Sequence, residues 1–137
     1  MRQSVRMAAL SAGAVIVFCA GFAAGQRPAP TGDQSVDQTL LATIDLAKVI
    51  VGSGDRELRL SRVTIAPHGH IGLHDHRDDP TVVYVLTGAL TNHHDDGTTS
   101  ELQAGQAFSE FGSRAHWVEN RGATAASFVF ASVSRRQ

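Results

Sequence analysis

Cysteine is almost absent from this chain, since Cys19 is the only one among 137 residues. Cys19 falls in a leader that we expect to be removed, so the mature chain is predicted to have none. This excludes a disulfide framework, a catalytic thiolate and a metal site built on cysteine. Any bound metal would have to be held by histidine, aspartate or glutamate side chains.

A strong charge of either sign is also missing. Twelve lysines and arginines stand against 13 aspartates and glutamates, for a formal net charge of −1. Two of the basic residues, Arg2 and Arg6, belong to the predicted leader, which leaves a mildly acidic mature protein. The remaining basic residues are scattered along the chain, so we predict no nucleic-acid partner.

A long apolar run occurs only near the N-terminus. Two arginines precede the apolar residues 7–22, and small residues follow directly, which is the order of a secretory signal peptide. We predict that residues 1–25 are a signal peptide cleaved after Gly25. The mature protein would then be periplasmic or secreted, without stable membrane insertion. The alternative is an uncleaved anchor, because the run is close to the shortest that spans a bilayer.

Helical periodicity is missing beyond residue 55. Residues 26–37 contain two prolines and a glycine and are predicted as a linker, whereas residues 40–51 fit a helix or a strand equally well. Short extended runs then alternate with glycine turns, and Asp96-Gly97 is the strongest hairpin signal. The predicted strands are residues 57–66, 81–86, 89–92, 98–102, 108–111, 116–118 and 127–133. The pattern predicts one all-β domain, a sandwich or barrel, over residues 38–135.

Four of the seven histidines lie within residues 68–76. On a strand, His74 and His76 point to the same face with their Cα atoms about 6.6 Å apart. Both rings can then reach one cation, because imidazole nitrogens bind metals at about 2.0–2.1 Å. A third ligand must come from elsewhere, and His116 is the candidate.

Two further histidines precede this pair. We predict residues 67–72 as a loop, in which His68 and His70 are expected to be solvated. His70 is the better candidate of the two for orienting a ligand ring from behind.

The motifs around these histidines resemble those of the cupin family. The first cupin motif combines a glycine, a His-x-His pair, a glutamate and a further glycine, and it is matched by Gly69, Gly72, His74, His76, residues 84–86 and Gly88. The second motif is matched by Gly105, His116 and Asn120. The resemblance covers residues 57–133.

This resemblance implies a fold and a site. The fold is the cupin double-stranded β-helix, a jelly-roll barrel. The metal ligands would be His74, His76 and His116, and the cofactor a divalent transition metal such as Fe, Mn, Zn, Ni or Cu. Cupins commonly pair, and residues 81–86 are apolar on both faces, so we expect a homodimer and a small-molecule ligand.

Three positions depart from the family pattern. Thr81 stands where the family has a glutamate ligand, Phe111 replaces a proline and Ser113 replaces a glycine. A threonine hydroxyl is a poor ligand, so we expect three histidines, with water or substrate at the other positions. The alternative is an oxygen ligand from Asp78 or Asp79, although acidic residues before a proline are usually solvated turn formers.

The residues around the motifs have simpler interpretations. Phe128 and Phe130 are expected in the core, and Val83, Val85 and Val118 in an apolar cavity wall. Trp117 should face away from its neighbour His116, toward the underside of the sheet or a dimer contact. We interpret residues 93–96 as a solvated hairpin tip, and Asn120 as a residue that stabilises a turn.

No acid–base residue can be assigned from the sequence. Glu110 and Glu119 lie near His116 in the chain, but the face on which each lies is undecided. Some cupins that resemble thiol and diketone dioxygenases use three histidines without a carboxylate.

We therefore predict an exported small cupin that binds a divalent transition metal and acts on or binds a small organic molecule, with dioxygenase-like activity as one option. The alternative is a non-catalytic binding or sensor module of the periplasm. A third reading is a scaffold whose histidines have lost the metal.

Overall fold

The computed structural model describes residues 27–136, and the predicted signal peptide lies outside this range. The described elements are β1 (Gln34–Asp45), a 3₁₀ turn η1 (Leu46–Lys48), β2 (Arg56–Thr87), β3 (Ala89–His94), β4 (Thr99–Gln103), β5 (Ala107–Glu119) and β6 (Ala126–Arg135). Within this part of the chain, no helix has the length and apolarity needed to cross a membrane.

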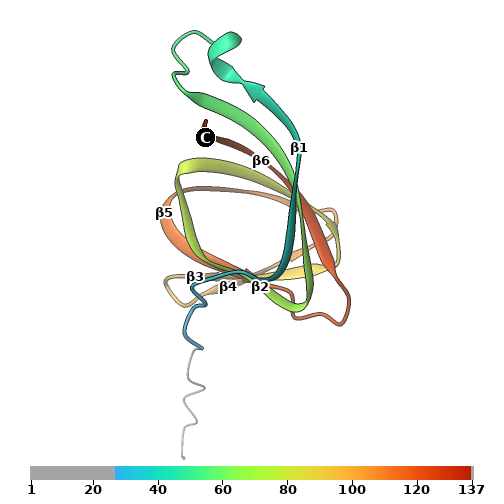
Figure 1. Cartoon of the computed structure of the whole chain (residues 1–137). Coiled ribbons are helices and arrows are strands. Elements are labelled where there is room, and N and C mark those ends of the chain that lie inside the picture. Colours follow the sequence, from blue (N-terminus) through green and yellow to red (C-terminus); the bar gives the residue numbers. More distant parts are fainter. Residues whose placement is uncertain (1–26, 137) are drawn as a thin grey trace, which may run out of the picture.

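Strand β2 organises the barrel, because its 32 residues pair with three other strands. Its first part, residues 56–65, lies between β1 and β6, and its last part, residues 81–87, also pairs with β6. Strand β6 therefore joins the two ends of β2 and closes the curved sheet (Figure 1). All pairs are antiparallel, and the sheet continues from β2 through β5 and β3 to β4. The predicted all-β barrel is confirmed.

The first strand begins earlier than the composition indicates. Strand β1 starts at Gln34, inside the stretch 26–37 that we predict as a linker. Gln34, Val36 and Asp37 pair with β2 through their backbone, and Val36 packs against the core. Backbone pairing at a sheet edge does not require alternating apolar residues, which is why the polar composition is misleading here.

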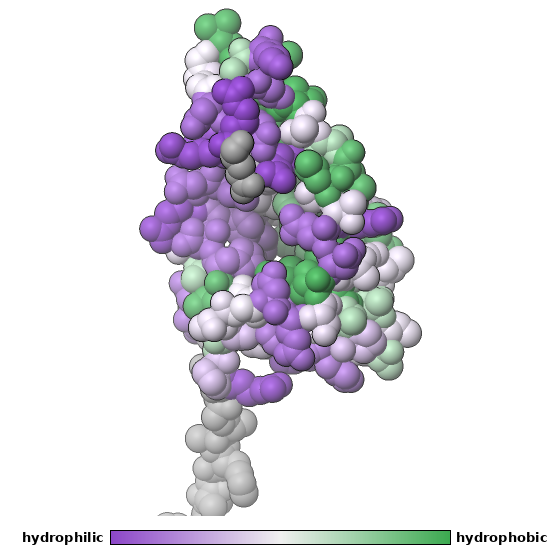
Figure 2. Space-filling view, in the orientation of Figure 1, coloured by the Kyte–Doolittle hydropathy of each residue, from purple (hydrophilic) through white to green (hydrophobic). Residues whose placement is uncertain are grey.

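Residues 40–51 contain both of the structures that the sequence leaves open. The strand continues to Asp45, whose side chain then accepts a hydrogen bond from the backbone N–H of Ala47 and caps the 3₁₀ turn. The hairpin formed by β1, η1 and the start of β2 projects beyond the barrel (Figure 1). Figure 2 shows apolar side chains at its surface, where Val49, Ile50 and Val51 are exposed.

The predicted loop at residues 67–72 is wrong, because the chain remains paired there. His70 and Ile71 lie opposite Glu119 and Val118 on β5. A single residue, His68, takes a left-handed conformation with φ of 62°, and its backbone N–H donates to the carbonyl of Asn120 over 2.9 Å. The bend signalled by Pro67 and Gly69 is thus confined to one residue, and β2 continues through it.

The core fills the interior between β2, β3, β5 and β6. Its buried apolar residues are Val63, Ile65, Val83, Leu90, Val118, Ala126 and Phe128, and Phe130 packs against them. The core positions predicted for Phe128 and Phe130 are confirmed. On the opposite face of β2, Val82, Tyr84 and Leu86 are exposed in the single chain.

The predicted hairpin at Asp96-Gly97 is also confirmed, because the turn connects β3 to β4. The backbone N–H of His94 donates to the carbonyl of Thr98 over 2.9 Å. Gly97 has a φ of 81°, a left-handed conformation that favours glycine.

Candidate metal centre

Three histidine rings from two adjacent strands converge inside the barrel. His74 on β2 lies directly opposite His116 on β5, and His76 follows on the same face of β2. One nitrogen from each ring lies within 4.8 Å of the other two. The predicted convergence of His74, His76 and His116 is confirmed, and their placement can hold a metal ion.

Backbone carbonyls determine which nitrogen faces the centre in two of these rings. His74 Nδ1 lies 2.7 Å from the carbonyl oxygen of Gly72, and His76 Nδ1 lies 3.0 Å from that of Asp79. A carbonyl oxygen only accepts hydrogen bonds, so each Nδ1 must carry the hydrogen. Both Nε2 lone pairs are then free to bind a metal, as in proteins whose ligating histidines donate their other N–H to the chain.

The third ring is oriented by a side chain. His116 Nδ1 lies 2.9 Å from Asn92 Oδ1, and Asn92 Nδ2 donates to Glu110 Oε1 over 3.2 Å. The carboxylate thus decides the orientation of the Asn92 amide, whose oxygen is left to accept from His116. Burial lowers the pKa of His116 to about 4, against the opposing effect of the Glu110 charge. His116 is therefore neutral at pH 7, with its Nε2 lone pair free.

These hydrogen bonds leave two lone pairs facing each other. His76 Nε2 and His116 Nε2 are only 3.1 Å apart. Two neutral imidazole nitrogens without a hydrogen between them repel at this distance, whereas a shared proton or a cation makes the contact favourable. A divalent cation suits three such nitrogens, because imidazole ligates Zn, Cu, Fe and Ni. The residues present fit a transition metal.

Glu110 is the site residue that sequence reasoning left unassigned. Its Oε2 lies 3.1 Å from His76 Nε2, and its Oε1 lies 3.1 Å from His116 Nδ1. Only 15% of its side chain is exposed. Burial lowers the pKa of His76, but the hydrogen bond to Glu110 and the carbonyl of Asp79 outweigh it, so the net shift is upward.

The position of Glu110 follows from the continuity of β5. Residues 110 and 116 are an even number apart and share a face on an unbroken strand. The sequence pattern predicts two separate strands, 108–111 and 116–118, and residues on separate strands cannot be assigned to a common face from their spacing. In the structure β5 runs from Ala107 to Glu119 without a break. The even spacing of residues 110 and 116 was the signal in the sequence that could have placed Glu110 in the site.

Thr81, which stands where the family has its glutamate ligand, lies beside Glu110. Thr81 is the cross-strand partner of Glu110, is buried, and donates its hydroxyl hydrogen to the carbonyl of Asp79 over 2.8 Å. Asp78 accepts from Arg56 through its carbonyl, and Asp79 reaches His76 through its own. Neither aspartate carboxylate joins the convergent set within residues 27–136.

A cavity of about 250 Å³ adjoins the rings of His74 and His76 inside the barrel. Its polar lining consists of Gln38, His74, His76, Asp79, Thr81 and Glu110. Its apolar lining consists of Val63, Ile71, Val83, Leu90, Phe108, Val118, Phe128 and Phe130. The apolar wall predicted for Val83 and Val118 is confirmed, and Val85 is buried but does not line this cavity.

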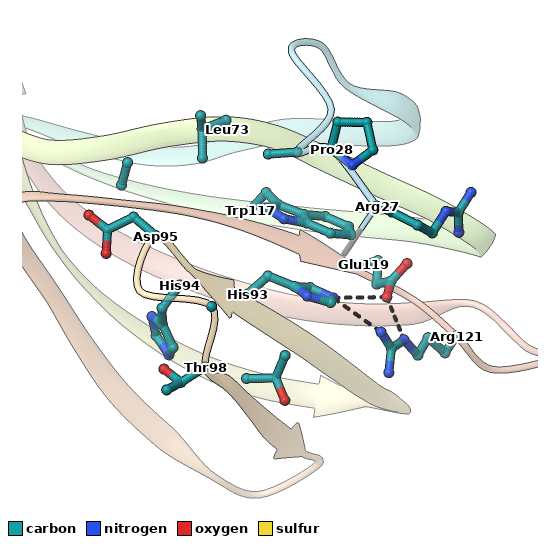
Figure 3. A pocket seen from close by; sticks show the side chains of 14 residues that line it. Arg27, Pro28, Leu73, His93, His94, Asp95, Thr98, Trp117, Glu119 and Arg121 are labelled. Atoms are coloured by element: carbon teal, nitrogen blue, oxygen red, sulfur yellow. Dashed lines mark hydrogen bonds and ion pairs between the residues drawn. The ribbon is translucent and has the colours of Figure 1, made fainter. Parts of the chain in front are cut away.

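A larger pocket of about 580 Å³ lies on the outer side of the barrel (Figure 3). There the ring of His93 stacks on Trp117, with centroids 3.8 Å apart and planes at 4°. Glu119 Oε1 accepts from His93 Nε2 over 2.9 Å and from Arg121 Nε. These polar groups satisfy one another.

The residues of this outer pocket and its surroundings test three of the predictions from the sequence. Trp117 faces away from His116, as expected. The interpretation of residues 93–96 as a solvated tip is wrong for His93 and His94, which are half-buried at the end of β3, whereas the two aspartates are exposed. His70 lies edge-on to Trp117, 6.4 Å between centroids, and does not orient a ligand ring.

Asn120 stabilises a turn, as predicted. Its buried side chain donates to the carbonyls of Ile65 and Thr124 and accepts from the backbone N–H of Gly122. The other two departures from the family pattern, Phe111 and Ser113, flank a glycine. Gly112, between Phe111 and Ser113, has a φ of 79° and lies opposite His76. Phe111 is 74% exposed, so its packing contributes little.

Comparisons with known proteins agree with this fold. The polyketide cyclase RemF from Streptomyces resistomycificus is similar at 22% identity over 78% of this chain and 70% of that chain, with a TM-score of 0.61. A predicted oxalate decarboxylase from Thermotoga maritima is similar at 20% identity over 78% of this chain and 94% of that chain, with a TM-score of 0.59. A cupin domain from Bordetella pertussis is similar at 25% identity over 80% of this chain and 99% of that chain, with a TM-score of 0.54. No functionally curated protein matches the sequence. Residues 61–132, more than half of the chain, match the family described as the cupin domain. The chain therefore belongs to the cupin family.

Proposed function

We propose that this protein is a metal-dependent cupin that binds one divalent transition metal, Fe, Mn, Zn, Ni or Cu, through Nε2 of His74, His76 and His116. The observation that carries the proposal is the close approach of three ring nitrogens whose opposite nitrogens all donate to the protein. This arrangement aims three lone pairs at one point before any metal arrives, which lowers the cost of binding.

The inner cavity supports a small organic molecule as the ligand or substrate. Its volume of about 250 Å³ suits a compact molecule, and its aromatic wall of Phe108, Phe128 and Phe130 favours an apolar body. A bound metal would supply Lewis acidity and open coordination positions for substrate oxygen atoms. The chain itself orients the molecule with the apolar wall and keeps bulk water away from the three rings. Glu110 offers a carboxylate that can accept a proton beside them.

Elemental analysis tests the metal. The mature protein, purified without a histidine tag, should carry about one equivalent of a transition metal, and His74→Ala should carry almost none. His93→Ala is the matched control, because His93 lies outside the barrel on Trp117 and should not affect metal content. Equal metal content in wild type and His74→Ala would reject the site.

Turnover is tested separately from binding. We expect the metal-loaded protein to consume oxygen or form product with a member of a panel of diketones, thiols, catechols and flavonols. Saturable binding without product, measured by calorimetry, would favour the alternative of a binding or sensor module. The absence of both turnover and binding across the whole panel would reject the proposed ligand class.

Export and pairing complete the proposal. The N-terminal pattern of basic, apolar and small residues supports cleavage after Gly25 and a periplasmic or secreted location. The exposed apolar side chains of Val82, Tyr84 and Leu86 support a homodimer. N-terminal sequencing of the secreted protein tests the first point. Light scattering of wild type and Tyr84→Lys tests the second.

A further inference from the structure

We propose that Glu110 supplies a fourth protein ligand to the metal, through Oε2 and from strand β5. The inference rests on the proposed function, because it concerns the same centre, and it names a ligand that the three-histidine prediction omits. Glu110 on β5 lies opposite Thr81 on β2. The carboxylate that the family pattern places at position 81 would therefore come from the neighbouring strand.

The spacing of the atoms is that of neighbouring ligands. Glu110 Oε2 and His116 Nε2 each lie 3.1 Å from His76 Nε2. Metal bonds to imidazole nitrogen and carboxylate oxygen are about 2.0–2.2 Å long, so adjacent ligands at right angles lie about 3.0 Å apart. Both atoms are thus spaced from His76 Nε2 as neighbouring ligands of one ion would be. Glu110 does not belong to the convergent set formed by His74, His76 and His116, so its side chain would have to move toward the ion to bind it.

The other oxygen of the carboxylate is held in place. Glu110 Oε1 accepts from Asn92 Nδ2 over 3.2 Å and lies 3.1 Å from His116 Nδ1. The hydrogen bond from Asn92 Nδ2 to Oε1 orients the group so that Oε2 lies toward His76. Such hydrogen bonds commonly position ligating carboxylates in metal sites.

The charge of the centre changes accordingly. Three neutral imidazoles leave a divalent ion with its full charge of +2 in a largely buried site. One carboxylate lowers this to +1, which compensates for the loss of water around the ion. We therefore expect higher metal affinity, and weaker attraction of anionic substrates, than three histidines alone would produce.

Cobalt binding tests the assignment with a readout other than activity. Glu110→Gln preserves the size of the side chain but removes its charge and weakens it as a ligand. We expect its Co²⁺ affinity, by calorimetry, to fall about 10- to 100-fold, and the visible absorption of bound Co²⁺ to change. Glu119→Gln is the matched control, because Glu119 is on the outer face of β5 with His93 and Arg121. It should bind Co²⁺ like the wild type.

A transposed pair keeps the test valid if Glu110→Gln does not fold. In Thr81→Glu/Glu110→Thr the two cross-strand partners exchange side chains, so one carboxylate remains between the same strands. Glu110→Thr alone is the reference. Recovery of the wild-type Co²⁺ affinity and spectrum in the folded transposed protein, after their loss in Glu110→Thr, supports the inference, and a wild-type affinity and spectrum in folded Glu110→Thr overturns it.

The two proposals fail in different ways. Wild-type Co²⁺ affinity and spectrum in Glu110→Gln, together with loss of binding in His74→Ala, would overturn the role of Glu110 and leave the three-histidine centre intact. Retained Co²⁺ binding in His74→Ala would reject the centre itself.

Discussion

His116 Nδ1 donates to Asn92 Oδ1 over 2.9 Å, between the paired strands β5 and β3. Both side chains are buried, and Asn92 also donates to Glu110. The bond holds the hydrogen on Nδ1 and leaves Nε2 free for a metal. A residue outside every cupin motif in this sequence thus determines which nitrogen of a motif histidine faces the centre.

Loss of this amide should therefore weaken metal binding. We expect Asn92→Leu, a change of similar volume, to lower metal affinity about 10- to 100-fold, because His116 loses its acceptor and Glu110 loses a donor. Calorimetric titration with Zn²⁺ measures the change. His93→Leu, on the same strand but facing Trp117, should leave the affinity unchanged. Equal losses in both variants would indicate a general weakening of β3.

The cavity wall also stabilises the barrel. Phe128 is 7% exposed and packs in the core, so Phe128→Ala should lower the free energy of unfolding by about 3–5 kcal/mol. Chemical denaturation followed by circular dichroism measures it. Phe111→Ala is the matched control, because Phe111 is 74% exposed and its loss should change stability by at most about 0.5 kcal/mol. A small effect at Phe128 would mean that the core does not close around this ring.

Gly72 lies between Gly32, which precedes β1, and the ring of His74. A Cβ at Gly72 would lie 2.7 Å from the backbone nitrogen of Gly32, and the Gly72 carbonyl accepts from His74 Nδ1. We expect Gly72→Ala to cost about 1–3 kcal/mol of stability through overpacking, and also to weaken metal binding. Thermal melting with and without Zn²⁺ measures both effects. Gly32→Ala, where a Cβ meets nothing within 4 Å, should melt like the wild type.

The outer pocket should make stability depend on pH. Burial raises the pKa of Glu119, but hydrogen bonds from Arg121 and His93 outweigh it, and the net pKa lies below the ordinary 4.5. A carboxyl whose pKa is lower in the folded state stabilises the fold above its ordinary pKa. This contribution is lost as the pH falls through the folded value.

The measurement is the melting temperature against pH for wild type and Glu119→Gln. The wild type should be the more stable above pH 4.5, and the difference should shrink as the pH falls below it. Glu101→Gln, at an exposed position on β4, is the control for a general effect of removing a carboxylate. A difference between wild type and Glu119→Gln that does not vary with pH would contradict the argument.

Some of the fold was predictable because it depends on local chemistry. The Asp96-Gly97 turn requires a left-handed glycine, and Asn120 satisfies backbone groups within a few residues of its own position, so both signals are readable in the sequence. The loop predicted at residues 67–72 was wrong because pairing with β5, which lies far along the chain, keeps that stretch extended. Local glycines and a proline carry no information about such a partner.

The candidate metal centre was likewise predictable only in part. The spacing of His74 and His76 determines that they share a face on any strand, and the cupin motifs single out His116 as their partner. Glu110 became part of the centre only because β5 is continuous and paired with β2, which places it opposite Thr81.

The sequence by itself determined the all-β character and the shared face of His74 and His76, because these follow from side-chain type and from alternation along a strand, and the cupin motifs added His116. Only the tertiary structure decided that Asn92 orients His116, that Glu110 lies inside while Glu119 lies outside, and that the cavity wall is aromatic. These contacts join residues on different strands, and strand register, which no short stretch of sequence encodes, brings them together.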